Sequence, residues 1–128
     1  MCIRDRDWEV IAERLEQVPA CLMGIRETLE LGVTRHVVSA RRQASVSAAK
    51  ARNYGGTESS PGFFRQLVAV YRGKSDGLRS RLEAAAKEGD RAYLDFADFV
   101  EQSYLPKAVA RDGCGPDLYQ LGLSLIHI

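Results

Sequence analysis

Apolar residues near the N-terminus recur at alternating spacings of three and four residues: Trp8, Ile11, Leu15, Val18, Leu22, Ile25 and Leu29. This spacing places their side chains along one stripe of an α-helix, whereas a half-buried strand would alternate with a period of two. No segment of the chain shows that alternation. The sequence therefore predicts an all-α fold, an irregular antiparallel bundle of three to four main helices.

Pro19 interrupts this apolar stripe. Proline lacks a backbone donor and clashes with the preceding turn, so we expect a kink or a break near Val18. The stripe continues in phase beyond Pro19, which predicts that both halves line the same groove. Gly32 is the expected end of the helix.

Three further helices are predicted. The first runs from Thr34, as its cap, to about Asn53, with small inward residues at Val37, Ala40, Ala44, Ala48 and Ala51, and ends at Gly55-Gly56. A short helix begins at Ser60-Pro61 and ends at Gly73. A long helix follows from about Gly77 to Tyr104, capped by Ser75 or Asp76, with a buried stripe at Leu78, Leu82, Ala85, Ala92, Phe96, Phe99 and Val100. Residues 111–116 have the composition of a turn.

The charge balance excludes several partners. The 128 residues carry 18 Lys and Arg against 17 Asp and Glu, a net charge of +1, so we expect no nucleic-acid partner and no membrane partner. The chain has no apolar run long enough to span a membrane, and its N-terminus has no apolar signal-peptide segment. Localisation stays unknown, with the cytoplasm expected if the parent protein lacks a signal peptide.

The two ends of the chain can be read as one DNA element in opposite directions. Residues 1–6 can be back-translated as ATG TGT ATA AGA GAC AG plus one base, and the reverse complement of that DNA would encode the Leu-Ser-Leu-Ile-His of residues 123–127. The element resembles a transposon end used to fragment DNA for sequencing. We therefore predict that residues 1–6 and 123–128 are adapter-derived tails of a metagenomic sequence, and that residues 7–122 are a helical fragment of a larger domain.

The residues that could carry chemistry are few and scattered. Between the predicted tails only His36 could supply an imidazole, and we interpret it as an exposed residue in the first turn of the second helix. Cys21 is predicted to be a buried, inert thiol beside Leu22, and Cys114 lies in a glycine loop without a nearby histidine. Asp95, Asp98 and Glu101 are predicted to form a solvated face. We therefore assign no catalytic, cofactor-binding or metal-binding residue, and expect no cofactor in this chain.

Charge alternates along the chain. The net charge is −4 over residues 7–30, +8 over residues 31–81 and −4 over residues 82–122. This order favours antiparallel neighbours of opposite charge. It also leaves a second interpretation open, in which the chain is a stand-alone binding module that docks an acidic partner through the basic helix 34–53, with Arg35, Arg41, Arg42, Lys50 and Arg52.

Several segments together resemble the bacterial domain of unknown function 885 family. They are Arg14–Ala20, Leu31-Gly32 before a basic helix, Ser60–Phe63, Arg81–Ala86, Ala92-Tyr93 through Tyr104–Ala108, and Asp112–Gly115 followed by Tyr119. The order and spacing of these segments carry the resemblance, which spans nearly all of residues 7–122 and includes a helix after the 112–115 loop.

The resemblance implies a parent protein of several hundred residues, mostly helical, and regarded as a zinc metallopeptidase-like hydrolase. Its His-Glu motif would lie downstream of this region, and nothing here matches it. We therefore expect this chain alone to have no enzymatic activity. Its partner would be the remainder of the parent polypeptide, and zinc and a small-molecule or peptide substrate would bind only the full-length protein.

Overall fold

The computed structural model describes residues 4–57 and 59–126, and within these ranges the fold is all-α, as the sequence predicts. The N-terminal stripe forms two helices, α1 (Asp5–Glu16) and α2 (Val18–Thr34). The break falls at Gln17, next to Pro19 in the first turn of α2, which confirms the predicted interruption. The prediction that Gly32 ends the helix is wrong, because α2 continues to Thr34.

The next helix, α3, spans Arg41–Gly55 and not the predicted 34–53. Thr34 is the last residue of α2, and residues 35–40 form a connection. The backbone of this connection bonds to a distant segment, since Arg41 N–H donates to the Val109 carbonyl at 2.7 Å and Val109 N–H donates to the Ser39 carbonyl at 3.2 Å. These long-range hydrogen bonds hold the end of the connection in a non-helical conformation, although the local sequence predicts a helix from Thr34. The predicted end is confirmed, with Gly56 after the helix at φ 79°.

The second half of the bundle begins with the short α4 (Phe63–Val68), which starts after the predicted Ser60-Pro61 and ends before the predicted Gly73. The long α5 (Asp76–Phe99) follows, and Leu78 N–H donates to the Ser75 hydroxyl at 3.3 Å, so Ser75 is the cap. The predicted helix extends to Tyr104, but its α-helical part ends at Phe99. A π-helical turn, η1 (Val100–Tyr104), and a 3₁₀ turn, η2 (Leu105–Lys107), close it at Pro106.

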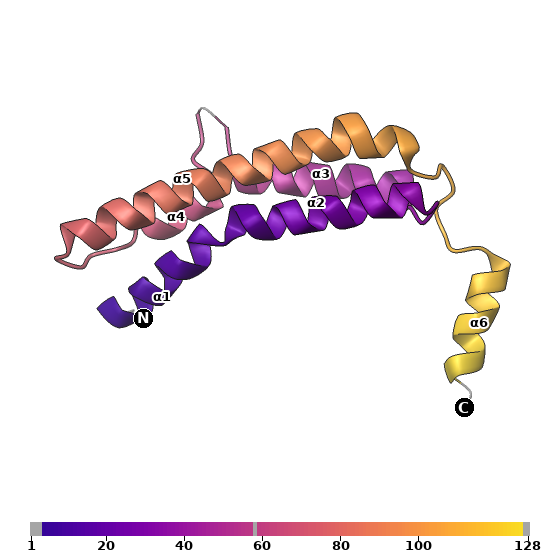
Figure 1. The fold of residues 1–128 in the computed structure, drawn as a ribbon, viewed down its shortest axis with the longest axis horizontal. Helices are drawn as coiled ribbons and strands as arrows, with labels where there is room; N and C mark the ends of the chain where they lie inside the picture. Colours follow the sequence, from indigo (N-terminus) through magenta and orange to yellow (C-terminus); the bar gives the residue numbers. More distant parts are fainter. Residues whose placement is uncertain (1–3, 58, 127–128) are drawn as a thin grey trace.

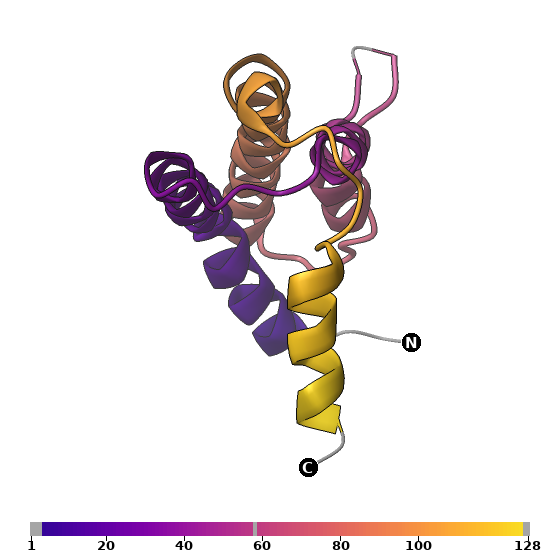
Figure 2. The same cartoon turned by 90° about the vertical axis from the view of Figure 1, so that its right-hand side faces the viewer.

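Helix α5 is the central element of the bundle. Helices α1 and α2 follow one of its sides, and α3 and α4 follow the other (Figure 1). Seen along the bundle, α2 and α3 lie on either side of α5 (Figure 2). The predicted stripe is buried at Trp8, Leu15 and Leu22, which confirms Trp8 as a packing residue. Ala44, Ala48 and Ala51 of α3 are buried as predicted, but Val37 is 73 % exposed in the connection before the helix.

The last helix, α6 (Pro116–Ile126), extends away from the bundle (Figures 1 and 2). It contains residues 123–126 of the predicted C-terminal tail, while Asp5 and Arg6 of the predicted N-terminal tail lie in the first turn of α1. Residues 1–3 and 127–128 of these tails lie outside the described residues. The adapter origin of the tails stays a prediction. None of the helices in the described ranges combines the length and the apolar character needed to cross a membrane.

Candidate functional site

The described residues form an apolar groove of about 760 Å³ between α2 and α3, which we call the α2/α3 groove. Its floor is α5 and η1, with Tyr93, Phe96, Val100 and Tyr104. One wall comes from α2 and the other from α3, with Leu22, Ile25, Leu29, Arg42, Gln43, Ala44, Val46, Ser47 and Ala51; Ser39 closes one end. Ile25 is 45 % exposed and Val46 is 50 % exposed, so the groove presents apolar side chains to water.

Small residues explain why the groove stays open. The side of α3 that faces α5 carries Ala44, Ala48 and Ala51, all buried. At the end of α3, a Cβ atom on Gly55 would lie 2.6 Å from Cδ2 of Leu94, so the two helices approach too closely for a side chain there. Because α3 packs tightly on α5 through small residues, no large side chain of its packed face reaches α2.

Two tyrosines give the groove its polar edges. Ser39 N–H donates to the Tyr104 hydroxyl at 2.9 Å, which fastens the α2–α3 connection to η1. Burial raises the pKa of Tyr93 above its ordinary value, with smaller contributions from Tyr54 and Cys21. Apart from the polar Ser39, Gln43 and Ser47, the rest of the lining is aliphatic and aromatic, with Arg42 as its charged residue. Such a lining suits the apolar face of a helix.

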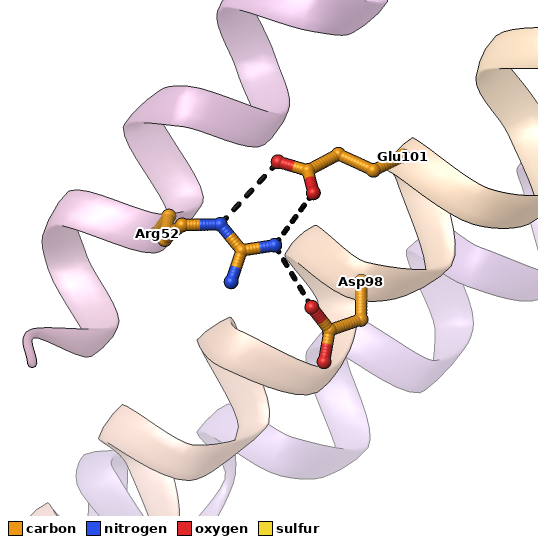
Figure 3. A network of polar contacts seen from close by, with 3 residues as sticks. All are labelled: Arg52, Asp98 and Glu101. Carbon is orange, nitrogen blue, oxygen red and sulfur yellow. Dashed lines mark hydrogen bonds and ion pairs between the residues drawn. The ribbon is translucent and has the colours of Figure 1, made fainter.

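An arginine ties α3 to the end of α5 (Figure 3). Arg52 Nη2 donates to Glu101 Oε2 at 2.7 Å and to Asp98 Oδ1 at 2.8 Å, and Nε contacts Glu101 Oε1 at 3.3 Å. Hydrogen bonding to Glu101 and then to Asp98 raises the pKa of Arg52. The predicted solvated acidic face is thus exposed but partly paired, since Asp98 and Glu101 bind the basic helix.

A buried carboxylate that sequence reasoning missed lies in the middle of α5. Asp90 is 2 % exposed. It accepts a hydrogen bond from Phe64 N–H at 3.1 Å and another from Arg65 Nε at 2.7 Å. Gly62 packs directly against the Asp90 carboxylate. Asp90 therefore supplies the cap that α4 lacks in its own sequence. The signal in the sequence was an acidic residue next to Gly89 and two residues before Ala92 of the predicted buried stripe.

The candidate residues for chemistry do not come together. His36 is not in a helix but in the α2–α3 connection, with φ 56°, because the second helix begins later than predicted. Cys21 is exposed on α2, so the prediction of a buried thiol is wrong; the side chain lies outside the buried stripe. Cys114 is exposed in the α5–α6 connection. In residues 4–57 and 59–126, no three His, Cys, Asp or Glu side chains are grouped to bind a metal.

The predicted basic helix is partly neutralised by the chain itself. Arg52 binds Asp98 and Glu101, and Arg42 Nη1 contacts Asp112 Oδ2 at 3.4 Å. Arg35 lies outside α3, in the connection. Lys50 lines a shallow depression with Tyr54 and Phe63, whose rings meet edge to face at 5.6 Å. The cationic groups are thus distributed over several surfaces.

The comparisons with known proteins give one positive result. No match was found among curated proteins or among solved structures. Residues 3–126 match the family described as "Bacterial protein of unknown function (DUF885)". This match covers nearly the whole bundle and α6, and it agrees with the resemblance of the ordered segments. The chain therefore belongs to the DUF885 family of bacterial proteins.

Proposed function

We propose that this chain is a non-catalytic helical segment of a larger, zinc-dependent, peptidase-like hydrolase, in which it forms part of the wall around the cleft. The observation that carries the proposal is the α2/α3 groove, whose apolar lining is open along the bundle. Contiguous exposed apolar surface of this kind marks a place where further polypeptide packs. The peptidase-like chemistry rests on the family resemblance alone.

The polar groups of the bundle support a structural role. Asp90 caps α4, Arg52 joins α3 to α5, and Arg81 joins α1 to α5 through Glu16. Each of these side chains is already bound to a neighbouring helix. The donor set of the described residues also does not fit a zinc ion, since His36 has no partner ligands grouped with it. We therefore assign zinc and substrate to the remainder of the parent protein.

The test compares this chain with the same chain extended along its source DNA. With added zinc and a mixed peptide substrate, we expect hydrolysis by the extended protein and none by the 128-residue chain. Clear turnover by the chain alone would overturn the proposal. So would an extended reading frame that stops immediately outside residues 1–128.

A second measurement follows the groove itself. At concentrations where the 128-residue chain is monomeric, a hydrophobic dye should bind it and lose that binding in the extended protein. Ser47→Trp, which fills the groove, should reduce dye binding, whereas Ser45→Trp should not, because Ser45 does not line the groove. Both serines are exposed on α3, so the pair separates the groove from a general surface effect.

The alternative, a stand-alone module that docks an acidic partner through residues 34–53, is less well supported. Arg42 and Arg52 already contact carboxylates of the same chain. Binding of an acidic peptide that falls steeply with salt and is weakened by Arg41→Ala would favour this alternative.

A further inference from the structure

Helix α6 and the α2/α3 groove are two unpartnered apolar surfaces on the same chain. Along α6, Asp117, Gln120 and Ser124 share one face at helical spacing, and the remaining arc carries Leu118, Tyr119, Leu121, Leu123 and Leu125. Leu118 is 61 % exposed and Leu121 is 62 % exposed. Figure 1 shows α6 standing apart from the helices of the bundle. An amphipathic helix without a partner and an apolar groove without an occupant fit the helix-in-groove mode of recognition.

The dimensions of the two surfaces agree. From Arg42 to Ala51, the α3 wall of the groove is about 14 Å long at 1.5 Å per residue. The apolar face from Leu118 to Leu125 spans about 10 Å on the same basis. The apolar face of α6, about two turns of helix, can therefore lie between the α2 and α3 walls.

The charges of the groove and of α6 are also compatible with packing of the helix into the groove. The charged residue of the groove lining is Arg42, and the charged residue of α6 is Asp117. These charges have opposite signs, so packing α6 into the groove creates no like-charge contact. The acidic residue lies on the polar face of the helix, which would remain at the mouth of the groove.

The connection to α6 directs the helix away from its own groove. Residues 39–41 and Val109 are joined by two backbone hydrogen bonds, and Arg42 contacts Asp112. Beyond this fastened segment, Gly113 and Gly115 have φ values of 145° and 85°, which turn the chain outward. With these contacts in place, the α6 helix of one molecule is available to a different molecule.

We propose that α6 of one molecule packs into the α2/α3 groove of a second copy, and that the exchange is reciprocal. The result is a two-fold dimer with two identical α6–groove contacts. The inference concerns the 128-residue chain by itself, whereas in the extended protein of the proposed function the parent polypeptide would cover the same groove. Leu118 and Leu121, which lie outside the predicted C-terminal tail, are enough to define the docking face.

The first experiment measures the dimer dissociation constant of the full chain by analytical ultracentrifugation. Leu121→Asp places a carboxylate on the docking face and should raise that constant about tenfold or more. Gln120→Asp places the same charge one residue away on the polar face and should change it less than about twofold. A chain that stays monomeric at every concentration, or a dimer that Leu121→Asp leaves intact, would overturn the proposal. Because α6 is separate from the bundle, circular dichroism should show both variants folded.

The second experiment tests whether α6 docks into the groove of another molecule or into the groove of its own molecule. Ser47→Trp blocks the groove but keeps α6, and Leu121→Asp disables α6 but keeps the groove. Each variant alone should be monomeric, and the mixture should form a heterodimer through the one intact α6–groove contact. Ser45→Trp is the control for the groove variant and should dimerise normally. A mixture that remains monomeric would mean that α6 does not exchange between molecules, and the proposal would be wrong.

Discussion

The two ends of the bundle are packed in different ways. At the end where α1, α4 and α5 meet, which we call the closed end, one cluster buries Trp8, Ala12, Leu15, Val68, Tyr71, Leu82, Ala85 and Ala86. At the other end, which we call the open end, the cluster is Ala44, Ala48, Phe99, Val100, Tyr104 and Ala108, and the α2/α3 groove lies beside it. Both ends use α5 as their centre, so the difference comes from the helices around it.

Side-chain size accounts for the difference. At the closed end, Trp8 of α1 meets Tyr71 edge to face at 5.4 Å, and both rings are almost fully buried. These two aromatic side chains fill the space among three elements. At the open end, the alanines of α3 pack against α5, but they are too small to fill the space toward α2. The same central helix therefore supports a complete core at one end and half of a core at the other.

The largest expected effect is at the closed end. Trp8→Ala removes a buried aromatic ring and its contact with Tyr71, and should lower the free energy of unfolding by about 3–5 kcal/mol. Ile25→Ala, in the groove, should lower it by about 1 kcal/mol or less, because Ile25 is already 45 % exposed. Urea unfolding followed by circular dichroism measures both. Equal losses would show that the groove is as well packed as the closed end.

The second-largest expected effect concerns Asp90, which lies on α5 between the closed end and the open end. Asp90→Ala leaves Phe64 N–H and the Arg65 guanidinium without their carboxylate, and should destabilise the fold by about 1–3 kcal/mol. Asp95→Ala on the same helix is the control, since Asp95 is exposed, and should change stability by less than about 0.5 kcal/mol. If the two variants melted alike, the capping role of Asp90 would be refuted.

Sequence reasoning succeeded where the information is local. The alternating apolar stripe, the break at Pro19 and the Ser75 cap each depend on residues within one or two turns, and the structure confirms all three. The same kind of reasoning predicted the burial of Ala44, Ala48 and Ala51, which is also confirmed.

The failures involve contacts between distant residues. The start of α3 moves from Thr34 to Arg41 because residues 39–41 bond to Val109, which is 70 positions away from Ser39 in the chain. Asp90 binds an N–H and a guanidinium 26 and 25 residues away. The groove was also missed, because a helical stripe shows which face is apolar but not whether a neighbouring helix covers that face.

A smaller effect is expected for the arginine that ties α3 to α5 at the open end. Arg52→Gln removes the contacts with Asp98 and Glu101, and should cost about 0.2–1 kcal/mol because all three side chains are at least 40 % exposed. High salt should shrink the difference from the unsubstituted chain. Arg41→Gln, on the same helix, is the control. A loss from Arg52→Gln that does not respond to salt would show that packing of the arginine stem, and not its charge, stabilises the open end.

The smallest effect is an acid dependence at the closed end. Arg81 Nε and Nη2 donate to the two oxygens of Glu16 at 2.6 and 2.8 Å, and this hydrogen bonding, followed by the attraction of the charges, lowers the pKa of Glu16 below its ordinary value of 4.5. The folded state therefore favours the charged carboxylate. Its contribution to stability is present above pH 4.5 and is lost as the pH falls through the lowered pKa. We expect Glu16→Gln to be less stable than the unsubstituted chain at neutral pH, and we expect this difference in urea midpoint to shrink as the pH falls through the lowered pKa. A difference between the two proteins that persists unchanged into acid would show that the α1–α5 contact does not depend on this charge.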